Sequence, residues 1–559
     1  MSESTYRMIE ILRILDECEN PTGSKLIAEE LKKKGFNLGE RAVRYHMQIL
    51  DEKGYTEKMG YSGRKITELG REILEKGLVY NQVDFIFSKF QEMIYLCDFD
   101  YENKNGNVVV NISNIYQKEA YNIIKKVFNA GLCISPFTDV KKIDKGKGYE
   151  IKIICGTTID GILLNNNIPS LPVYGGLLEV EDHVPTKFTE LISYKKTSIT
   201  PLDAFIGKDM TSVLNIVEEG SGRMPANFRV IPSSAREKTI AIFEKLKSIG
   251  INGIIDIGES GENVLGIPVS ENMTGIAIIG GITPLCAAQE TNYNVKIKMG
   301  EDFTSFDKLA PITPPDKHIL KSSNQHDTPP IPFLLSKSWN LIEKVDFDVK
   351  TKKGNIIANV SRIDYSDVDN ALEIMEKTYE SSPDYISPYY NIKTNENGTI
   401  DISTVCSLSV DGILINNGIM STPKYGGLLE LSQKPLFIEL ISYDGSSIDP
   451  HKIFIYKNLT SVNSSMNKPN RILASLKEVP YISRSESEKV ISKLRNLDFS
   501  IYKVSNPREL MYNAKIDNYN FGIVAGSGLN TIAAIKEEGI QIDVKALEKM
   551  MPLEKMKHL

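Results

Sequence analysis

The stretch IDGILLNNNIPSLPVYGGLLE at residues 159–179 returns as VDGILINNGIMSTPKYGGLLE at residues 410–430. Fifteen of the 21 aligned positions are identical, far more than chance would give. Neighbouring blocks return in the same order. DFDYENKNGNVVVNIS at 98–113 reappears as DFDVKTKKGNIIANVS at 346–361, and FTELISY at Phe188 reappears as FIELISY at Phe437. The offset drifts only from 252 to 248 across these blocks, so a whole domain of about 230 residues is duplicated, a period far too long for a solenoid repeat.

A proline-rich segment separates the two copies. Residues 311–332 contain six prolines in 22 residues, which disfavours a helix or a central strand and favours an extended linker. The predicted organisation is therefore a head at 1–78, a first repeated domain at 79–310, the linker at 311–332 and a second repeated domain at 333–559.

Each copy mixes strand and helix patterns. In the first copy GNVVVNIS, YEIKIIC, GILLNN, YGGLLEV and KFTELISY are typical of strands, while QKEAYNIIKKVFNAG and SAREKTIAIFEKLKSIG are typical of helices. The repeated stretch is interpreted as a turn at Asp160-Gly161 followed by two strands. The predicted fold class is α+β and multidomain, with two tandem homologous α/β domains after the head.

The head follows the winged helix-turn-helix plan. YRMIEILRILDE, KLIAEELKKKG and ERAVRYHMQILDEKG predict three helices, and YTEKM, GYSG and RKITE predict a hairpin after them. On the third helix Val43, Met47 and Leu50 share the face that packs on the other helices. The opposite face carries Arg41, Arg44, Tyr45 and Gln48, side chains able to read base edges in the major groove or to bind phosphate.

The predicted wing adds basic residues beside this face. Lys58 precedes the tight turn, and Arg64 and Lys65 follow it, so all three are expected to touch the DNA backbone or minor groove. The head is not basic overall, because residues 1–78 hold 14 Lys/Arg and 14 Asp/Glu. A protein-interaction role for the winged helix therefore stays open.

Composition excludes several classes of protein. The net charge of -6 rules out a globally basic nucleic-acid coat, so any DNA contact must be local. Six scattered cysteines without C-x-x-C spacing argue against zinc clusters and disulfides. No long apolar run and no signal-peptide pattern occur, and we expect a cytoplasmic protein without membrane contact.

Enzyme signatures are scarce in both copies. There is no Walker A loop, no H-E-x-x-H, no G-x-S-x-G and no complete G-x-G-x-x-G. The histidines do not match between copies, which excludes a duplicated histidine-based catalytic or metal site. We expect no catalytic residues, no metal and no cofactor, and a small-molecule ligand instead.

Several groups of the first copy are suited to hold a small anion. They are strand-end hydroxyls and a thiol, glycine-rich backbone near a helix start, and two arginines. The candidate residues are Cys155, Thr157, Thr158, Tyr174, Gly175, Gly176, Arg223, Arg229, Gly280, Gly281 and Thr283. Two alternatives stay open: Tyr174-Gly175-Gly176 as a strand beginning at a glycine bulge, and Cys155 as a core residue.

The copies differ at some of these candidates. Cys155 returns as Cys406, but the residues after it change to Ser407 and Leu408. We align Arg471 with Arg229, which leaves Arg223 without a counterpart. The first copy is therefore expected to hold the stronger ligand site.

The combination of a winged helix, two copies carrying DGILLNNN…YGGLLE and FTELISY, and a proline-rich junction resembles NrpR. That is the nitrogen-regulatory transcriptional repressor family of methanogenic archaea, and the resemblance covers essentially the whole chain. It implies a repressor of nitrogen-assimilation and nitrogen-fixation genes that binds inverted-repeat DNA operators and is released by 2-oxoglutarate. Such an operator implies a homodimer. An amino-acid effector, an enzyme acting on a small carboxylic acid and a protein-binding scaffold are the alternatives.

Overall fold

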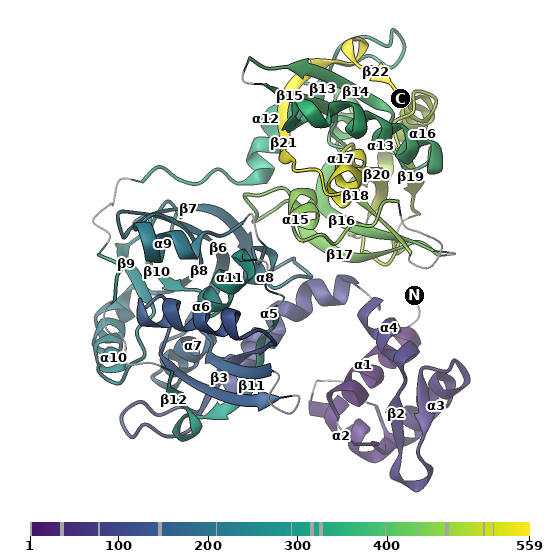
Figure 1. Ribbon diagram of the computed structural model, residues 1–559. Helices are drawn as coiled ribbons and strands as arrows, with labels where there is room; N and C mark the ends of the chain where they lie inside the picture. The colour runs from purple at the N-terminus through teal and green to yellow at the C-terminus, as the bar shows by residue number, and fades with distance from the viewer. Residues whose placement is uncertain are drawn as a thin grey trace.

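The computed structural model describes residues 3–559 except 19, 34–37, 77–78, 144–147, 208–209, 292, 294, 313–317, 323–327, 397, 433, 464–468, 507–508 and 518. Three bodies follow one another along the chain, as Figure 1 shows: the purple head, the blue-to-teal first copy and the green-to-yellow second copy. In the part of the chain described, no helix is long and apolar enough to cross a bilayer.

The head is a winged helix-turn-helix. Its elements are α1 (Glu3–Glu17), α2 (Ser24–Lys33), α3 (Glu40–Glu52), β1 (Thr56–Lys58), β2 (Arg64–Ile66) and α4 (Glu68–Lys76). The apolar stripe of each helix meets in one small core that contains Leu12, Ile27, Val43 and Met47. The two short strands pair antiparallel and form the wing.

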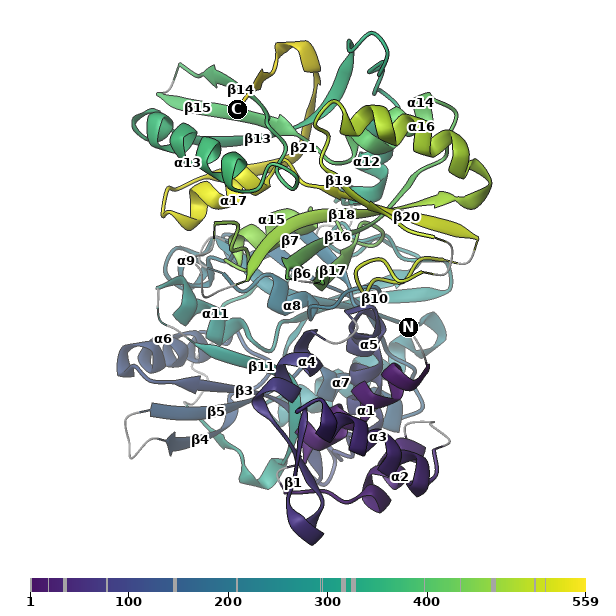
Figure 2. The ribbon, with the colours of Figure 1, turned by 90° about the vertical axis from the view of Figure 1, so that its right-hand side faces the viewer.

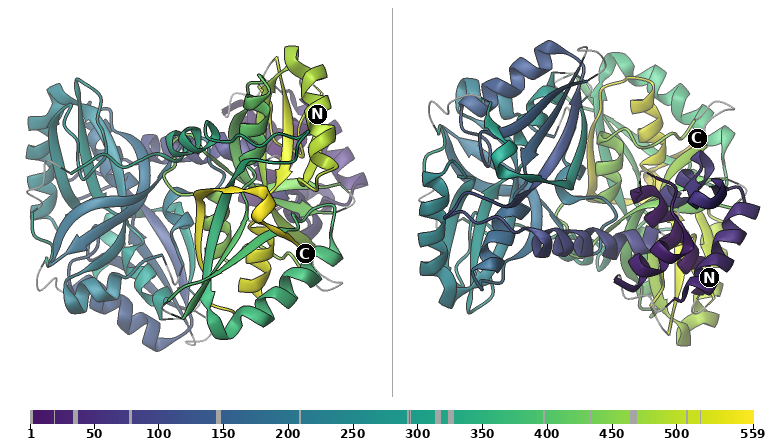
Figure 3. Two further views of the ribbon diagram at one scale, coloured as in Figure 1. Left: turned by 90° about the horizontal axis from the view of Figure 1, so that it is seen from above. Right: turned by 90° about the horizontal axis from the view of Figure 1, so that it is seen from below.

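Helix α5 (Val79–Leu96) joins the head to the first copy. The helix contacts α7 (Thr157–Asn165) of the first copy and also β17 (Leu436–Ser442) of the second, which α4 touches as well. Seen from below in Figure 3, α5 spans the distance from the first copy to the head. The connection is therefore a helix that is packed against both copies.

The first copy consists of two five-stranded antiparallel sheets with helices packed on them. The strand orders are β11-β3-β5-β4-β12 and β7-β6-β8-β10-β9. Its strands are β3 (Asn107–Ile115), β4 (Phe137–Ile143), β5 (Gly148–Ile154), β6 (Leu171–Glu181), β7 (Val184–Ser193), β8 (Gly222–Pro232), β9 (Ile254–Ser260), β10 (Met273–Ile279), β11 (Lys296–Ser305) and β12 (Ala310–Pro311). Its helices after α5 are α6 (Lys118–Asn129), α7, α8 (Pro201–Ala204), α9 (Val213–Glu219), α10 (Arg236–Ser248) and α11 (Thr283–Glu290).

The second copy repeats this plan. Its sheets run β21-β13-β15-β14-β22 and β17-β16-β18-β20-β19. Its strands are β13 (Asn355–Asp364), β14 (Tyr389–Thr394), β15 (Thr399–Val405), β16 (Thr422–Leu431), β17, β18 (Asn470–Pro480), β19 (Ile501–Val504), β20 (Asn520–Gly526), β21 (Asp543–Pro552) and β22 (Lys557–His558). Its helices are α12 (Leu334–Ile342), α13 (Val368–Ser381), α14 (Ser409–Asn416), α15 (Pro450–Tyr456), α16 (Arg484–Arg495) and α17 (Asn530–Glu537). The duplication seen in the sequence is thus a duplication of architecture.

The opening stretch is not a turn followed by two strands, as its sequence had suggested. GILLN at 161–165 belongs to α7, and only the part from Leu171 onward is a strand, β6. Every residue from Thr157 to Leu163 is buried. The helix therefore has no exposed face, and its sequence lacks the alternation of polar and apolar residues that marks a surface helix. A short apolar run is compatible with a buried strand or a buried helix, and only the surrounding packing decides between them.

The two copies exchange segments across an approximate two-fold axis. The chain after β7 crosses to β17, where the Ser198 amide donates to the Leu440 carbonyl at 2.9 Å; in return the Ser447 amide donates to the Leu191 carbonyl at 2.9 Å. Figure 2 shows the copies stacked at this junction. Apolar side chains of both copies also share one core.

Each side of the junction holds a half-buried glutamate. The Ser447 hydroxyl donates to Glu190 at 3.0 Å, and the Ser198 hydroxyl donates to Glu439. Burial raises the pKa of Glu190 and raises that of Glu439 to about 7, although the hydrogen bond from Ser198 opposes the latter shift. The junction therefore contains a carboxyl group that titrates near neutral pH.

The described part of the linker runs over the first copy rather than through solvent. The amides of Ile319, Lys321 and Ile331 donate to carbonyls of Ala130, His183 and Gly266. Residues 318–322 and 328–333 form neither helix nor strand. The rest of the predicted linker lies largely outside the described residues.

Candidate functional sites

Helix α3 presents two different faces. Val43, Met47 and Leu50 are buried, as is His46 at the edge of that face. The predicted DNA-contacting residues Arg41, Arg44, Tyr45 and Gln48 are all exposed, with Tyr45 61% exposed. Arg44 forms an exposed ion pair with Glu40 one turn earlier. This face is open to a duplex, and the Arg44–Glu40 pair is weak enough at the surface to exchange for phosphate or a base.

The wing residues fall into two groups. Lys58 and Lys65 are exposed on the two paired strands. The Nε of Arg64 instead donates to both carboxylate oxygens of Asp51 on α3, at 2.7 Å and 3.0 Å. Its backbone also pairs with Thr22. Arg64 thus fastens the wing to α3, a role that spacing alone did not reveal.

A small cavity lies inside the first copy, where its two sheets meet. Its volume is about 20 Å³. The lining residues are Phe90, Asn111, Cys155, Thr157, Asp160, Pro172, Tyr194, Thr200, Leu202, Asn227, Arg229, Gly281, Ile282 and Met299. They come from α5, α7, both sheets and the crossover after β7, and many of them are polar.

Arg229 is the dominant charged group of this cavity. Its side chain is 2% exposed and that of Asp160 is 1% exposed. Nε donates to one Asp160 oxygen at 2.7 Å, and Nη2 donates to the other at 2.7 Å. Nη1 is buried and makes no hydrogen bond. A buried guanidinium nitrogen without an acceptor is costly, so the site is poised to take an anionic oxygen.

The other polar groups form pairs around Arg229. The Tyr194 hydroxyl donates to the Asn227 side-chain oxygen at 2.6 Å. The Cys155 thiol lies 3.4 Å from the Thr157 hydroxyl. Burial raises the pKa of both Tyr194 and Cys155. Both groups therefore stay protonated at neutral pH and add no negative charge to the cavity.

The cavity gathers some of the sequence candidates and not others. Cys155, Thr157, Arg229 and Gly281 line it. Candidates outside the lining are Thr158, Tyr174, Gly175, Gly176, Arg223, Gly280 and Thr283.

Most of the candidates outside the cavity lining make contacts that hold the fold together. Thr158 bonds both the amide and the carbonyl of Val109. A Cβ on Gly175 would lie 2.7 Å from the Pro201 side chain, so this glycine permits close packing. Tyr174 packs against Phe228 and Phe333 beside a bulge in β6. Tyr174 is packed, as the architectural alternative for the YGG triplet expected, but the strand begins at Leu171 and its bulge against β8 lies before Tyr174 rather than at the glycines.

Six polar or aromatic lining residues escaped the sequence reasoning: Phe90, Asn111, Asp160, Tyr194, Thr200 and Asn227. Asn111, Asp160 and Tyr194 do carry a signal, because each recurs in the second copy as Asn359, Asp411 and Tyr443. Asp160 was interpreted as a turn residue, and its burial in α7 corrects that interpretation. Phe90 and Asn227 carried no such signal.

Strand pairing also corrects the alignment of the arginines. Arg223 lies opposite Glu179 on β6, and Arg471 lies opposite Glu430 on β16, so these two arginines are the equivalent pair. Arg229 corresponds instead to Lys477. The loops before β8 and β18 differ in length, and this difference misled the alignment of KPNR with ANFR.

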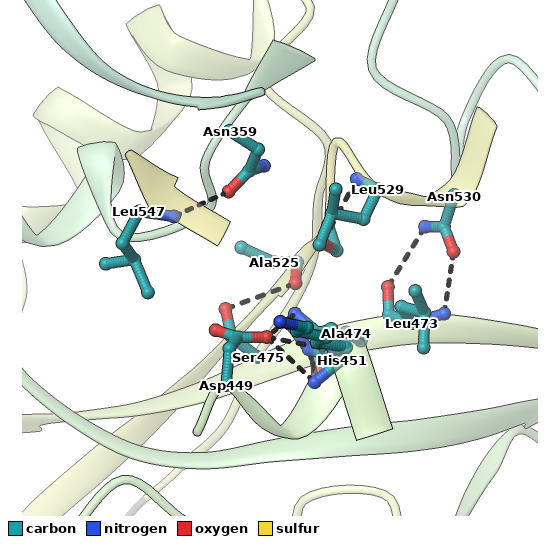
Figure 4. A network of polar contacts seen from close by, with 12 residues as sticks. Asn359, Asp449, His451, Leu473, Ala474, Ser475, Ala525, Leu529, Asn530 and Leu547 are labelled. Carbon is teal, nitrogen blue, oxygen red and sulfur yellow. Dashed lines mark hydrogen bonds and ion pairs between the residues drawn. The ribbon is translucent and has the colours of Figure 1, made fainter. Parts of the chain in front are cut away.

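The equivalent place in the second copy has different chemistry. The Lys477 ammonium pairs with Asp411 at 2.8 Å and donates to the Ser475 hydroxyl at 2.9 Å, with Lys477 and Asp411 fully buried. Figure 4 shows the neighbouring His451, whose Nε2 lies 3.1 Å from the Ala474 carbonyl, and Asp449, which accepts from the His451 amide. The two copies therefore keep a buried ion pair but not the same polar groups around it.

A metal centre finds no support among the described residues, where no group of three or more His, Cys, Asp or Glu is placed to hold an ion.

Comparisons with known proteins cover the whole chain. The family model of NrpR regulatory domains NRD1 and 2 matches residues 83–311 and 331–558, and that of the ribonuclease R winged-helix domain matches 9–74. The global nitrogen regulator NrpR of Methanococcus maripaludis is 34% identical over 98% of both chains. That of Methanocaldococcus jannaschii is 36% identical over 100% of this chain and 98% of its own.

Two shorter relatives match parts of the chain. Global nitrogen regulator NrpRI of Methanosarcina mazei is 40% identical over 52% of this chain and 93% of its own. The crystal structure of a nitrogen repressor-like protein from Methanococcus jannaschii is 31% identical, covers 41% of this chain and 99% of its own, and has a TM-score of 0.37. The names of these relatives describe regulators rather than enzymes. With a full-length match to both regulatory domains and a winged helix in front of them, this chain belongs to the NrpR family of nitrogen regulators.

Proposed function

We propose that this protein represses nitrogen-assimilation and nitrogen-fixation genes by binding inverted-repeat operators, and that 2-oxoglutarate releases it from DNA. The observation that carries the effector half is Arg229, whose buried Nη1 lacks an acceptor beside a polar cavity. One carboxylate of the effector accepts from Nη1. The hydroxyl and amide groups of Thr157, Asn227 and Asn111 are suited to the keto oxygen and second carboxylate.

The DNA half rests on the head. α3 offers exposed Arg41, Arg44 and Gln48, and the wing offers Lys58 and Lys65. Because each chain carries one head, an inverted repeat requires two chains, with their recognition helices about one helical turn apart. The two repeated domains pair with each other inside one chain, so they do not replace this second chain. We therefore propose a homodimer.

The test uses the full-length protein and a duplex that it selects from a random library. Fluorescence anisotropy measures the affinity for this duplex during titration with 2-oxoglutarate, glutarate or glutamine. We expect 2-oxoglutarate to weaken DNA binding by about tenfold or more, within the usual range of allosteric coupling. Glutarate, which lacks the keto oxygen, should act more weakly, and glutamine should not act.

The other outcomes decide between the alternatives. Release by glutamine alone would make the effector an amino acid. Consumption of 2-oxoglutarate, followed by proton NMR, would favour an enzyme. Failure to select any duplex would favour a protein-binding winged helix.

A further inference from the structure

The cavity is far smaller than the ligand proposed for it. A volume of about 20 Å³ holds roughly one water, which needs about 10–15 Å³. Pockets for small molecules usually measure about 300 Å³ or more, and 2-oxoglutarate has about ten non-hydrogen atoms. A dicarboxylate can therefore enter only if part of the wall moves.

One wall residue belongs to the helix that carries the head. Phe90 of α5 is buried, and its ring lies 5.0 Å from the Tyr194 ring in an edge-to-face contact. It also faces Gly300, where an added Cβ would lie 3.4 Å from the ring. One turn before it, Phe87 lies under the ammonium of Lys195 on the crossover between copies. The other lining residues belong to the sheets, helices and loops of the first copy itself.

In the second copy, the sizes of the side chains at two lining positions are reversed. Gly161 closely faces Cys97 just after α5, and Gly412 faces Val345 just after α12 in the same way, so α12 is the equivalent of the end of α5. This equivalence places Ser338 at the position of Phe90, and the alignment of residues 159–179 with 410–430, extended to the preceding residues, places Leu408 at that of Thr157. The first copy has a large side chain, Phe90, on α5 and a small one, Thr157, on α7. The second copy has the reverse.

We propose that Phe90 is the plug of the effector cavity: an entering dicarboxylate displaces Phe90 together with α5, and this displacement moves the head away from its DNA-binding position. The proposal rests on the proposed function and adds how occupancy reaches the DNA. The effector binds only the form of the protein in which Phe90 has moved out of the cavity, so binding shifts the population toward that form. Since α5 and α4 also contact β17, its displacement changes how the head sits on the second copy.

The first experiment needs no effector. Thr157→Leu introduces the side chain of Leu408 and overfills the cavity, so it should push Phe90 out and imitate the ligand. We expect it to weaken binding to the selected duplex by about tenfold, which corresponds to about 1.4 kcal/mol. The double variant Thr157→Leu/Phe90→Ser reproduces the pair of the second copy and should restore binding to near the wild-type value.

Two results of this cycle would overturn the proposal. One is a folded Thr157→Leu protein that binds DNA like the wild type. The other is a double variant whose loss is the sum of the single losses, because a shared cavity predicts non-additivity. Circular-dichroism melting reports folding. If Thr157→Leu does not fold, Met299→Phe on another part of the wall serves as the enlarging variant, with the same expected rescue by Phe90→Ser.

The second experiment uses 2-oxoglutarate itself. By calorimetry, Phe90→Ser should bind it several-fold more tightly than the wild type, because no plug has to leave. The same variant should show a smaller effector-induced loss of DNA affinity. Tyr95→Ala is the matched control, since Tyr95 lies on the same helix but is 77% exposed, and it should change neither quantity. Unchanged values for Phe90→Ser would refute the plug. Absence of any 2-oxoglutarate binding to the wild type would refute the proposed effector instead, while the size-swap cycle still tests the mechanical link.

Discussion

Replacing Arg229 by lysine separates anion recognition from folding. In the wild type Arg229 uses Nε and Nη2 for Asp160, and Nη1 remains for a ligand. A lysine ammonium at this place keeps the ion pair, as the Lys477–Asp411 pair does at 2.8 Å in the second copy. A lysine ammonium is a compact point charge at the end of its stem, so when it is held at Asp160 it no longer places a donor where Nη1 lies.

The expected magnitude follows from the bonds that are lost. A hydrogen bond to a charged group contributes about 1.5–3 kcal/mol, so one lost carboxylate contact weakens 2-oxoglutarate binding by roughly 10- to 100-fold. The free energy of unfolding should change by no more than about 1–2 kcal/mol. Arg229→Met would be less informative, because an unpaired buried Asp160 costs about 3–5 kcal/mol and would confound binding with unfolding.

Calorimetry with 2-oxoglutarate measures the affinity, and urea unfolding followed by circular dichroism measures stability. Arg223→Lys on the same strand is the matched control, because Arg223 lies outside the cavity lining. An Arg229→Lys protein with unchanged effector affinity would refute the role of Nη1. An equal loss of 2-oxoglutarate affinity in Arg229→Lys and Arg223→Lys would show that the substitutions disturb strand β8 rather than a contact with the ligand.

Three further predictions concern the head and the junction between copies. Arg44→Ala should weaken DNA binding by about 1–3 kcal/mol in anisotropy titrations while effector binding in calorimetry stays unchanged; unaltered DNA affinity would contradict the reading face of α3. Arg64→Ala should lower the melting temperature of the head, because it removes the hydrogen bonds from Nε to both Asp51 oxygens. Lys65→Ala should instead reduce DNA affinity and leave the melting temperature unchanged, and the reverse pattern would contradict the assignment of the wing. Burial raises the pKa of Glu439 to about 7 from an ordinary value of 4.5, so its contribution to stability is complete below about pH 4.5 and is lost as the pH rises through 7. The melting temperature should therefore fall between pH 5 and pH 8, and Glu439→Gln should flatten this dependence; an equally steep profile in the variant would refute it.

The sequence by itself determined the duplication, the winged helix and the surface of its recognition helix. Long identical blocks survive only where whole domains repeat, and amphipathic helices display their buried and exposed faces in their period. The exposure of Arg41, Arg44, Tyr45 and Gln48 could be predicted for that reason. Four residues chosen from the sequence as suited to an anion, Cys155, Thr157, Arg229 and Gly281, line the same cavity.

Only the tertiary structure decided the rest. α7 is buried on all sides, so its sequence period could not distinguish it from a strand. The pairing of Asp160 with Arg229 depends on two elements far apart in the chain. Strand register, rather than local similarity, paired Arg229 with Lys477. Phe90 lies outside every repeated block, and its place in the cavity wall arises solely because α5 packs over the first copy on its way from the head. A sequence pattern reflects the packing of the helix or strand in which a residue lies, whereas a cavity is formed by residues from several elements that are distant in the sequence.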